Sequence, residues 1–295
     1  MKYKKIITIL VVCIVILGAV VALSGIFSTG GTGEYQFTSI HGQSITIYGK
    51  GIYKNNSTAA VMQAIPQDIV TLALGIPMLI ISLFLARKGL IKGRLLLAGV
   101  EGYFLVTYFM YIFIAMYNRL FLIYAALISI SFFAFILTLM SFDIEKLKTY
   151  YNKKLPAKFV GGFLLFASIM VGLLWLSRVM PTLINGTIPV DLLEHGTTLP
   201  VQAIDLAFFL PSAFIAGILI IKKKSMGYLL APVATFFLIL MMAALFSKGV
   251  SMTITGAEGT LPMMIMTSIF DVIAILSSII ILKNIKEPSN GSINK

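Results

Sequence analysis

The residues of this sequence that are best placed to do chemistry are two acids inside long apolar runs. Asp271 lies near the middle of the run 261–282, and Glu101 lies toward the start of the run 95–117. An aspartate at the centre of a bilayer costs roughly 2.5–3.5 kcal/mol on insertion scales, so both side chains are expected to face other helices. Because no lysine or arginine is expected at either depth, desolvation favours the neutral acid. Asp271 and Glu101 are therefore predicted to be buried protonatable groups.

Hydroxyl side chains share helix faces with both acids. Residues about one, two or three helical turns apart lie on the same face of a helix. Such a face forms a polar seam between helices, which serves either proton or ion binding or simply helix association through hydrogen bonds. The predicted partners are Thr267, Ser268 and Ser278 for Asp271, and Tyr108 for Glu101.

A second polar group follows two prolines near the starts of apolar runs. Asp68 comes just after Pro66, and Asp205 comes soon after Pro200. Both acids are predicted to look into one vestibule at the outer mouth of the bundle. The alternative is local, because the helix dipole stabilises an acid in the first turn of a helix by roughly 0.3–1 kcal/mol. The predicted vestibule residues are Asp68, Asp205, Arg178, Gln67 and Gln202.

The sequence contains no strong motif for a metal, a cofactor or a nucleophile. Its two histidines are His41 and His195, whereas a hydrolytic zinc site needs three protein ligands and an open position. They are weak metal candidates, and turn or interfacial positions are the default interpretation. No glycine-rich phosphate loop is followed by the lysine and helix that such a loop requires. We therefore assign no cofactor and no catalytic residue, and do not expect an enzyme.

The elements that must position these residues are membrane-spanning helices. Of the 295 residues, 59% are hydrophobic and only 12% are charged, and the mean hydropathy is +0.99. A soluble domain has roughly 25% charged residues, and a spanning helix needs about 20 apolar residues. The sequence therefore predicts an all-α polytopic membrane protein of eight transmembrane helices, with the lipid bilayer as a partner. The eight runs are 6–23, 69–86, 95–117, 120–142, 159–177, 206–221, 228–246 and 261–282.

The basic residues lie mainly on one side of this topology. With a cytoplasmic N-terminus, 18 of the 23 Lys and Arg residues fall in cytoplasmic segments, as the positive-inside rule requires. This predicts a multi-pass protein of the cell membrane with both termini in the cytoplasm, and it explains the net charge of +12 without a nucleic-acid partner. The run 6–23 is predicted to be an anchor, because a secretory signal has a core of about 7–15 residues; a cleaved signal stays the alternative.

The eight helices fall into two sets of four. At an offset of 134 residues, Pro66 aligns with Pro200, and Gly93 aligns with Gly227. Two halves of the same orientation would form a parallel repeat, an arrangement that many transporters use. The predicted units are 1–142, with an outer loop at 24–67, a basic cytoplasmic linker at 143–158, the second half at 159–283 and a cytoplasmic tail at 284–295.

The outer loop 24–67 carries a strand-like pattern. The segments around Phe37 and Ile45 alternate apolar with polar residues. Between them, the pair His41 and Gly42 suits the centre of a hairpin turn, because glycine adopts positive φ freely and histidine does so more readily than most residues. A small extracytoplasmic β-hairpin is therefore expected between the first and second spanning helices.

Several stretches resemble a known family. They are "YGKGIY", "PQD", "ARKGLIKGRLLLAGVEGYFLVTY" and "YNRLFLIYAALISIS", with a weaker likeness in "IDLAFFLP" and "KKKSMGYLLAP". On these stretches the chain resembles a family of uncharacterised multi-pass membrane proteins of bacteria and archaea. The resemblance implies the same multi-pass topology, and it assigns no functional residue.

Three functions are compatible with these observations. The first is a transporter or permease for a small solute, coupled to protons through Asp271 and Glu101. The second is a non-catalytic assembly, sensory or envelope-maintenance factor that binds a membrane-protein partner through its outer loop. The third and least supported is a lipid-modifying enzyme that acts at the outer face.

Overall fold

The computed structural model describes residues 2–256 and 259–287. Within this part of the chain, eight helices are long and apolar enough to cross a membrane, and each predicted apolar run lies largely inside one of them. The protein is an integral membrane protein of the all-α class, as predicted. Of the predicted tail 284–295, residues 288–295 lie outside the described part. The spanning helices are Lys4–Phe27, Thr58–Arg87, Ile91–Ile114, Phe121–Met140, Ala157–Asn185, Pro200–Ile221, Gly227–Ile254 and Thr260–Lys283.

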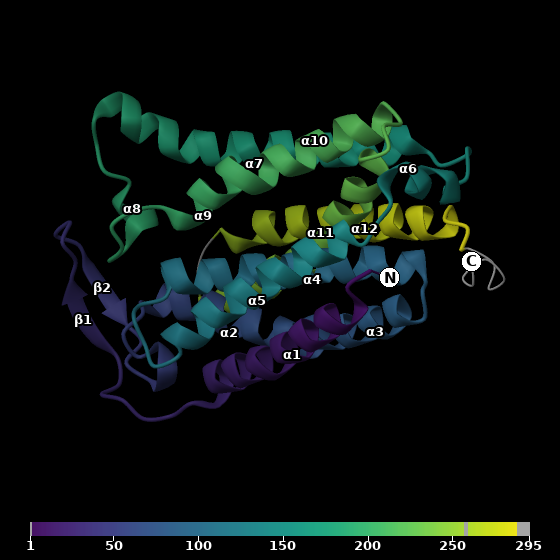
Figure 1. Ribbon diagram of the computed structural model, residues 1–295. Helices are drawn as coiled ribbons and strands as arrows, with labels where there is room; N and C mark the ends of the chain where they lie inside the picture. Colours follow the sequence, from purple (N-terminus) through teal and green to yellow (C-terminus); the bar gives the residue numbers. More distant parts are fainter. Residues whose placement is uncertain (1, 257–258, 288–295) are drawn as a thin grey trace.

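The spanning helices run between two ends of the molecule (Figure 1). The hairpin end carries the strands β1 (Tyr35–Thr38) and β2 (Ser44–Ile47) and the short helix α8 (Val190–Leu193). The basic end carries the start of α1, the end of α12 and the linker with α6 (Ile144–Leu147). The remaining helices are α1 (Lys4–Phe27), α2 (Thr58–Val70), α3 (Ile76–Arg87), α4 (Ile91–Ile114), α5 (Phe121–Met140), α7 (Ala157–Asn185), α9 (Pro200–Ile204), α10 (Leu210–Ile221), α11 (Gly227–Ile254) and α12 (Thr260–Lys283).

The predicted hairpin is confirmed. β1 and β2 pair antiparallel, with Phe37 opposite Ile45. Of the two residues expected at positive φ, only Gly42 adopts it, at 82°. The backbone N–H of His41 donates instead to the hydroxyl of Ser39 at 3.2 Å. The turn therefore requires glycine at one position only, because the Ser39 hydroxyl accepts the backbone N–H of His41 and stabilises the rest of the loop.

Two of the spanning helices contain a wider π-helical turn. In the first half it covers Thr71–Gly75, between α2 and α3, and in the second half it covers Asp205–Phe209, between α9 and α10. Soon after each turn comes a proline, Pro77 or Pro211. Proline has no N–H to donate, and its ring displaces the carbonyl four residues earlier. Both displaced carbonyls lie inside the π turns, which accounts for the widening at these two positions.

The apolar interior forms two clusters that meet along α4 and α11. One cluster is built mainly by α1 to α5, and the other mainly by α7, α10, α11 and α12 together with the start of α4. Helices α4 and α11 cross closely at Gly99, where an added Cβ atom would lie 2.5 Å from the Cβ of Phe236. Helix α7 pairs with α10, and this pair forms a layer beside α11 and α12 (Figure 1).

The crossing of α7 and α10 gives a first test of this packing. An added Cβ at Gly161 would lie 2.6 Å from the backbone oxygen of Gly217, whereas one at the neighbouring Gly162 would meet nothing within 4 Å. Alanine gains up to about 1 kcal/mol of helix propensity over glycine, but overpacking costs about 1–3 kcal/mol. We expect Gly161→Ala to lower the melting temperature of the detergent-solubilised protein, and Gly162→Ala to keep or raise it. A fall for both variants, or for neither, would contradict the crossing.

Candidate functional site

Asp68 of α2 is the centre of a buried polar cluster. Its side chain is 2% exposed. The Tyr53 hydroxyl donates to Oδ2 at 2.7 Å, and the Tyr111 hydroxyl of α4 donates to Oδ1 at 2.6 Å. Tyr53 precedes α2 in the loop outside the spanning helices, and burial raises the pKa of its hydroxyl well above the ordinary value. The tyrosine therefore stays protonated and donates to the carboxyl group.

Helix α1 closes this cluster because Gly25 has no side chain. An added Cβ at Gly25 would overlap Oδ2 of Asp68 and would lie 2.8 Å from the hydroxyl oxygen of Tyr53. Glycine is the residue that permits such a close approach of backbone to a polar group. The apolar face of α1 thus covers a carboxyl group and a tyrosine at van der Waals distance.

Gln67 extends the polar contacts from α2 to α4. Its amide nitrogen donates to the Tyr103 hydroxyl at 2.8 Å and to the Thr107 hydroxyl at 3.3 Å. The Tyr103 hydroxyl also lies 2.8 Å from the hydroxyl of Thr71, the first residue of the π turn. The structure therefore places Gln67 and Asp68 together inside the bundle, where both bind tyrosines of α4.

Asp205 occupies the first position of the second π turn. Its Oδ2 accepts a hydrogen bond from the indole N–H of Trp175 on α7 at 2.8 Å. The aspartate and the tryptophan are both half-buried. Asp205 therefore keeps one carboxyl oxygen without a hydrogen bond to a described residue.

Lys248 of α11 lies within electrostatic range of both Asp68 and Asp205. The sequence suggests an outer loop for this lysine, because the apolar run 228–246 ends before it. In the structure the lysine is helical, because α11 continues to Ile254 and packs on α2. Within residues 2–256 and 259–287, neither carboxylate has a cation in ion-pair contact. The half-buried lysine is thus attracted by two acids and paired with neither.

Glu101 is fully buried on α4. One carboxyl oxygen accepts a hydrogen bond from the Thr138 hydroxyl of α5 at 3.0 Å, and the other has no partner among the described residues. Tyr108, the partner suggested by helix periodicity, packs toward α1 instead, where an added Cβ at Gly18 would lie 3.1 Å from its hydroxyl oxygen. Glu101 therefore bonds across to α5 through a residue that periodicity within α4 does not indicate.

Asp271 is half-buried on α12 and has one enclosed oxygen without a partner in the described chain. The hydroxyls of Thr267 and Ser268 donate to the backbone oxygen of Met264 in their own helix, at 3.1 Å and 2.7 Å. The Ser278 hydroxyl is enclosed and also lacks a partner there. The predicted partners thus do not bind Asp271 in this structure, and its role as a protonatable group stays a prediction.

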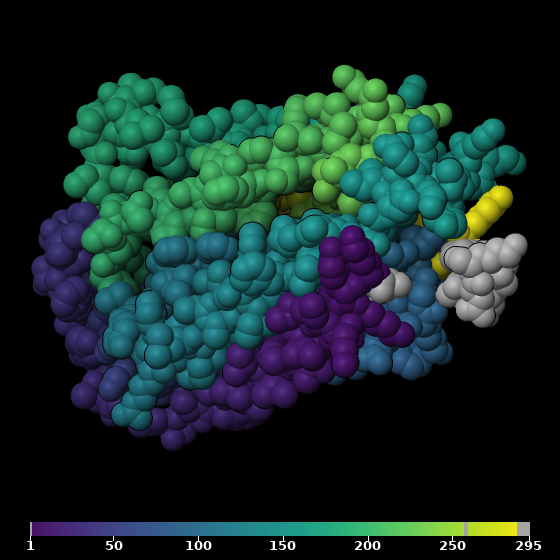
Figure 2. Space-filling view, in the orientation of Figure 1, coloured from purple at the N-terminus to yellow at the C-terminus, as the bar shows by residue number. Residues whose placement is uncertain are grey.

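The two histidines lie where the hairpin meets the segment after α8. His41 Nε2 is 3.3 Å from the backbone oxygen of Gly196, next to His195. Gln43 of the same turn donates to Asp191 at 3.5 Å. Figure 2 shows this contact between the N-terminal hairpin and the segment around α8 at one end of the molecule. Among the described residues, no group of three His, Cys, Asp or Glu side chains is placed to hold a metal ion.

Two predicted vestibule residues make no hydrogen bond to the Asp68 cluster in the described part of the chain. Arg178 is exposed on α7, and Gln202 is half-buried on α9. Four residues of the site were not assigned to it from the sequence. The signal for Tyr111 and Trp175 was weak, because aromatic residues near the ends of apolar runs are ordinarily interfacial. Tyr53 and Lys248 lie outside the predicted runs. These four are Tyr53, Tyr111, Trp175 and Lys248.

Comparison of the chain with protein-family models, with curated proteins and with solved structures finds no match. Any functional conclusion therefore depends on the geometry of the site itself. In that geometry, Asp68 of α2 and Asp205 at the start of the second π turn each lie within electrostatic range of Lys248 of α11.

Proposed function

We propose that the protein transports a small polar solute or ion, and that Asp68, Asp205 and Lys248 form its binding site. The observation that carries this proposal is the position of Lys248, which lies within electrostatic range of two carboxylates without pairing with either in the described chain. Ionisable residues within membrane spans are costly and usually mark a pathway for a solute or an ion. A polar solute would supply the contacts that Lys248 and the free carboxyl oxygen of Asp205 leave open, beside the carboxyl group of Asp68 that two tyrosines hold in place.

The two interrupted helices support this assignment. Asp205 begins one π turn, and Thr71, which contacts Tyr103 beside the Asp68 cluster, begins the other. Transporters commonly bind solutes where spanning helices are discontinuous, and π turns are frequent at functional sites. Both interruptions lie on the helices that provide the two carboxylates.

We also propose that the halves 1–142 and 159–283 form a parallel repeat. The two π turns begin and end at the same offset of 134 residues that aligns the prolines. The turns after α3 and α10 match as well: the N–H groups of Gly89 and Lys223 bind Ala86 and Ile220 carbonyls, both at 3.0 Å. Both of these turn residues have positive φ. A repeat supports transport because one half can move against the other around a site between them.

We further propose that this transport is coupled to protons through Glu101 and Asp271. The complete burial of Glu101 and its free oxygen support it, because a carboxyl group without a counter-charge inside a membrane protein is a common proton carrier. The half-buried Asp271, with one enclosed oxygen free, gives weaker support.

Currents across proteoliposomes, measured with a panel of amines, amino acids and monovalent cations, test the proposal. We expect Asp205→Asn and Lys248→Met each to reduce the solute-driven current by roughly tenfold or more, because a hydrogen bond to a charged group is worth about 1.5–3 kcal/mol. Arg178→Gln removes an exposed charge from α7 and is the matched control, which should keep its current. Equal currents for Asp205→Asn and Arg178→Gln, or no current with any solute, would contradict the proposal.

One observation favours partner binding as a second candidate function. Tyr35 and Phe37 of β1 are 44% and 43% exposed, and the outer edge of β1 can accept a further strand. In that case the double change of Tyr35→Ser and Phe37→Ser abolishes function while Asp205→Asn is tolerated. Transport predicts the opposite result for both.

A further inference from the structure

A cavity of about 130 Å³ lies at the basic end, between the start of α4 and the short helix α6. This volume exceeds the roughly 10–15 Å³ that one water molecule needs on the same measure, so the space can hold a phosphate-sized group. This cavity lies at the opposite end of the helices from the hairpin. Its polar and aromatic lining consists of Arg94, Ser141, Phe142, Asp143, Lys146 and Tyr150.

Arg94 is held firmly at this cavity and has donors to spare. Its Nη1 donates to the backbone oxygen of Ser141 at 3.1 Å, and its guanidinium carbon lies 4.7 Å from the ring centre of Phe142. Its Nε is enclosed and has no partner among the described residues. Guanidinium carries five N–H donors in a planar fork that matches the oxygens of a phosphate. In the described chain the guanidinium makes its hydrogen bond through Nη1, so the Nη2 end of the fork is available to a ligand.

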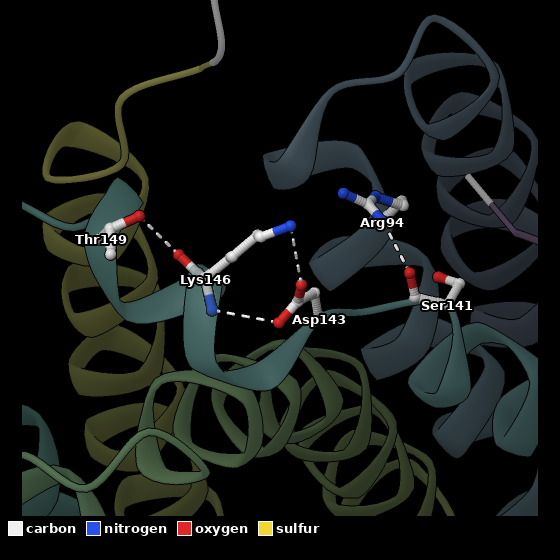
Figure 3. A network of polar contacts seen from close by, with 5 residues as sticks. All are labelled: Arg94, Ser141, Asp143, Lys146 and Thr149. Carbon is white, nitrogen blue, oxygen red and sulfur yellow. Dashed lines mark hydrogen bonds and ion pairs between the residues drawn. The ribbon is translucent and has the colours of Figure 1, made fainter. Parts of the chain in front are cut away.

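Lys146 stands across the cavity from Arg94 (Figure 3). Its Nζ lies 3.3 Å from Oδ2 of Asp143, and both side chains are mostly exposed. Such an exposed pair contributes little, so the lysine can turn toward a stronger anion. Asp143 has a second role that keeps it in place, because its Oδ1 accepts the backbone N–H of Lys146 at 3.2 Å. This backbone hydrogen bond holds the pKa of Asp143 below its usual range, so the aspartate stays charged. The two cations Arg94 and Lys146 outnumber it, and the lining keeps a net positive charge.

The start of α4 already binds one anionic group. The backbone N–H groups of Ile91 and Lys92 donate to the carboxylate of Glu287 at 2.7 Å and 3.0 Å. The N-terminus of a helix favours negative charge through its free N–H groups and its dipole. Because the chain's own glutamate occupies these two donors, the free donors at the cavity are those of Arg94 and Lys146.

We propose that this cavity binds a phosphate group through Arg94 and Lys146. Two sources carry the same chemistry, namely the headgroup of an anionic phospholipid and a free phosphate in solution. Basic pockets at the ends of spanning helices are suited to lipid headgroups, while paired arginine and lysine donors are suited to either source.

Calorimetry with inorganic phosphate and the detergent-solubilised full chain tests the first source. Nanodiscs of phosphatidylcholine, with and without a minor fraction of phosphatidic acid, test the second when the bound lipid is counted by native mass spectrometry. We expect Lys146→Gln to weaken phosphate or phosphatidic acid binding roughly tenfold, since a charge-assisted hydrogen bond is worth about 1.5–3 kcal/mol. Lys148→Gln removes the same charge from an exposed neighbouring position and should change binding less than about twofold.

Each outcome decides the proposal. Binding of inorganic phosphate that Lys146→Gln weakens supports a free phosphate, and retention of phosphatidic acid alone with the same dependence supports a lipid headgroup. Equal loss in Lys146→Gln and Lys148→Gln would mean attraction by general surface charge and would overturn the site. No binding of either probe would overturn it as well. The same binding measurements on Arg94→Gln test the second cation and should also show weaker binding. The melting temperature of that variant is measured alongside to show that it is folded.

Discussion

Asp68→Ala is expected to lower the free energy of unfolding by about 2–4 kcal/mol. The change leaves the Tyr53 hydroxyl without its acceptor in a buried place, and it removes one of the two acceptors of the Tyr111 hydroxyl. An unsatisfied buried donor costs about 1–3 kcal/mol, and the cavity left by the carboxyl group adds to this. Asp68→Asn keeps a carbonyl oxygen and an amide of the same shape, so we expect a loss of no more than about 1 kcal/mol.

Unfolding in mixed micelles with increasing denaturant measures both variants. Asp205→Ala is the control, because Asp205 is half-buried and accepts a single hydrogen bond from a half-buried tryptophan. Its loss should be about 1 kcal/mol. If Asp68→Ala and Asp205→Ala lowered the unfolding free energy equally, Asp68 would not be the anchor of the tyrosine cluster.

The spanning helices could be predicted because hydropathy depends on local sequence. A bilayer forces every backbone polar group into a helix or a closed barrel, so an apolar run of sufficient length has few other structures available. The limit of this reasoning is visible at Lys248. Hydropathy ends the seventh run at residue 246, but nothing forces a helix to stop where its residues become polar, and α11 continues to Ile254. Lys248 is therefore part of a helix and not of a loop.

The partners of the buried acids could not be predicted in the same way. Periodicity indicates which residues share a face of one helix, and it placed Tyr108 near Glu101 on that ground. The observed partner, Thr138, comes from α5, and only the packing of α4 on α5 could select it. Tyr53 and Tyr111 reach Asp68 from two different elements for the same reason. Hydrogen bonds between helices depend on tertiary contacts, for which one sequence carries no direct signal.

The two proposed halves differ in how firmly they enclose their acids. Asp68 is covered by α1 and bound by two tyrosines, whereas Asp205 is half-buried and bound by one indole. In a repeat with one site between its halves, this asymmetry would make Asp205 the acid that is free to exchange partners with a solute. Asp68 would then fix the position of α2 relative to α4.

Gly25→Ala is expected to lower the unfolding free energy by about 3 kcal/mol, although it removes no polar group. The added methyl would overlap Asp68 Oδ2 and crowd the Tyr53 hydroxyl. Either α1 or the carboxyl group must then move, and overpacking of this kind costs about 1–3 kcal/mol before the broken hydrogen bonds are counted. The melting temperature of the purified protein measures the effect. Gly18→Ala is the matched control on the same helix, with nearest contacts at 3.1 Å and 3.3 Å, and it should cost less than about 1 kcal/mol.

A double-mutant cycle shows whether the effect passes through Asp68. In Gly25→Ala combined with Asp68→Ala, the shorter side chain at position 68 makes room for the new methyl. The combined loss should therefore be smaller than the sum of the single losses by about 1–2 kcal/mol, within the range measured for residues in direct contact. Strictly additive losses would mean that α1 does not approach Asp68 at Gly25. Another helix would then have to pack against Asp68 and Tyr53 and bury them.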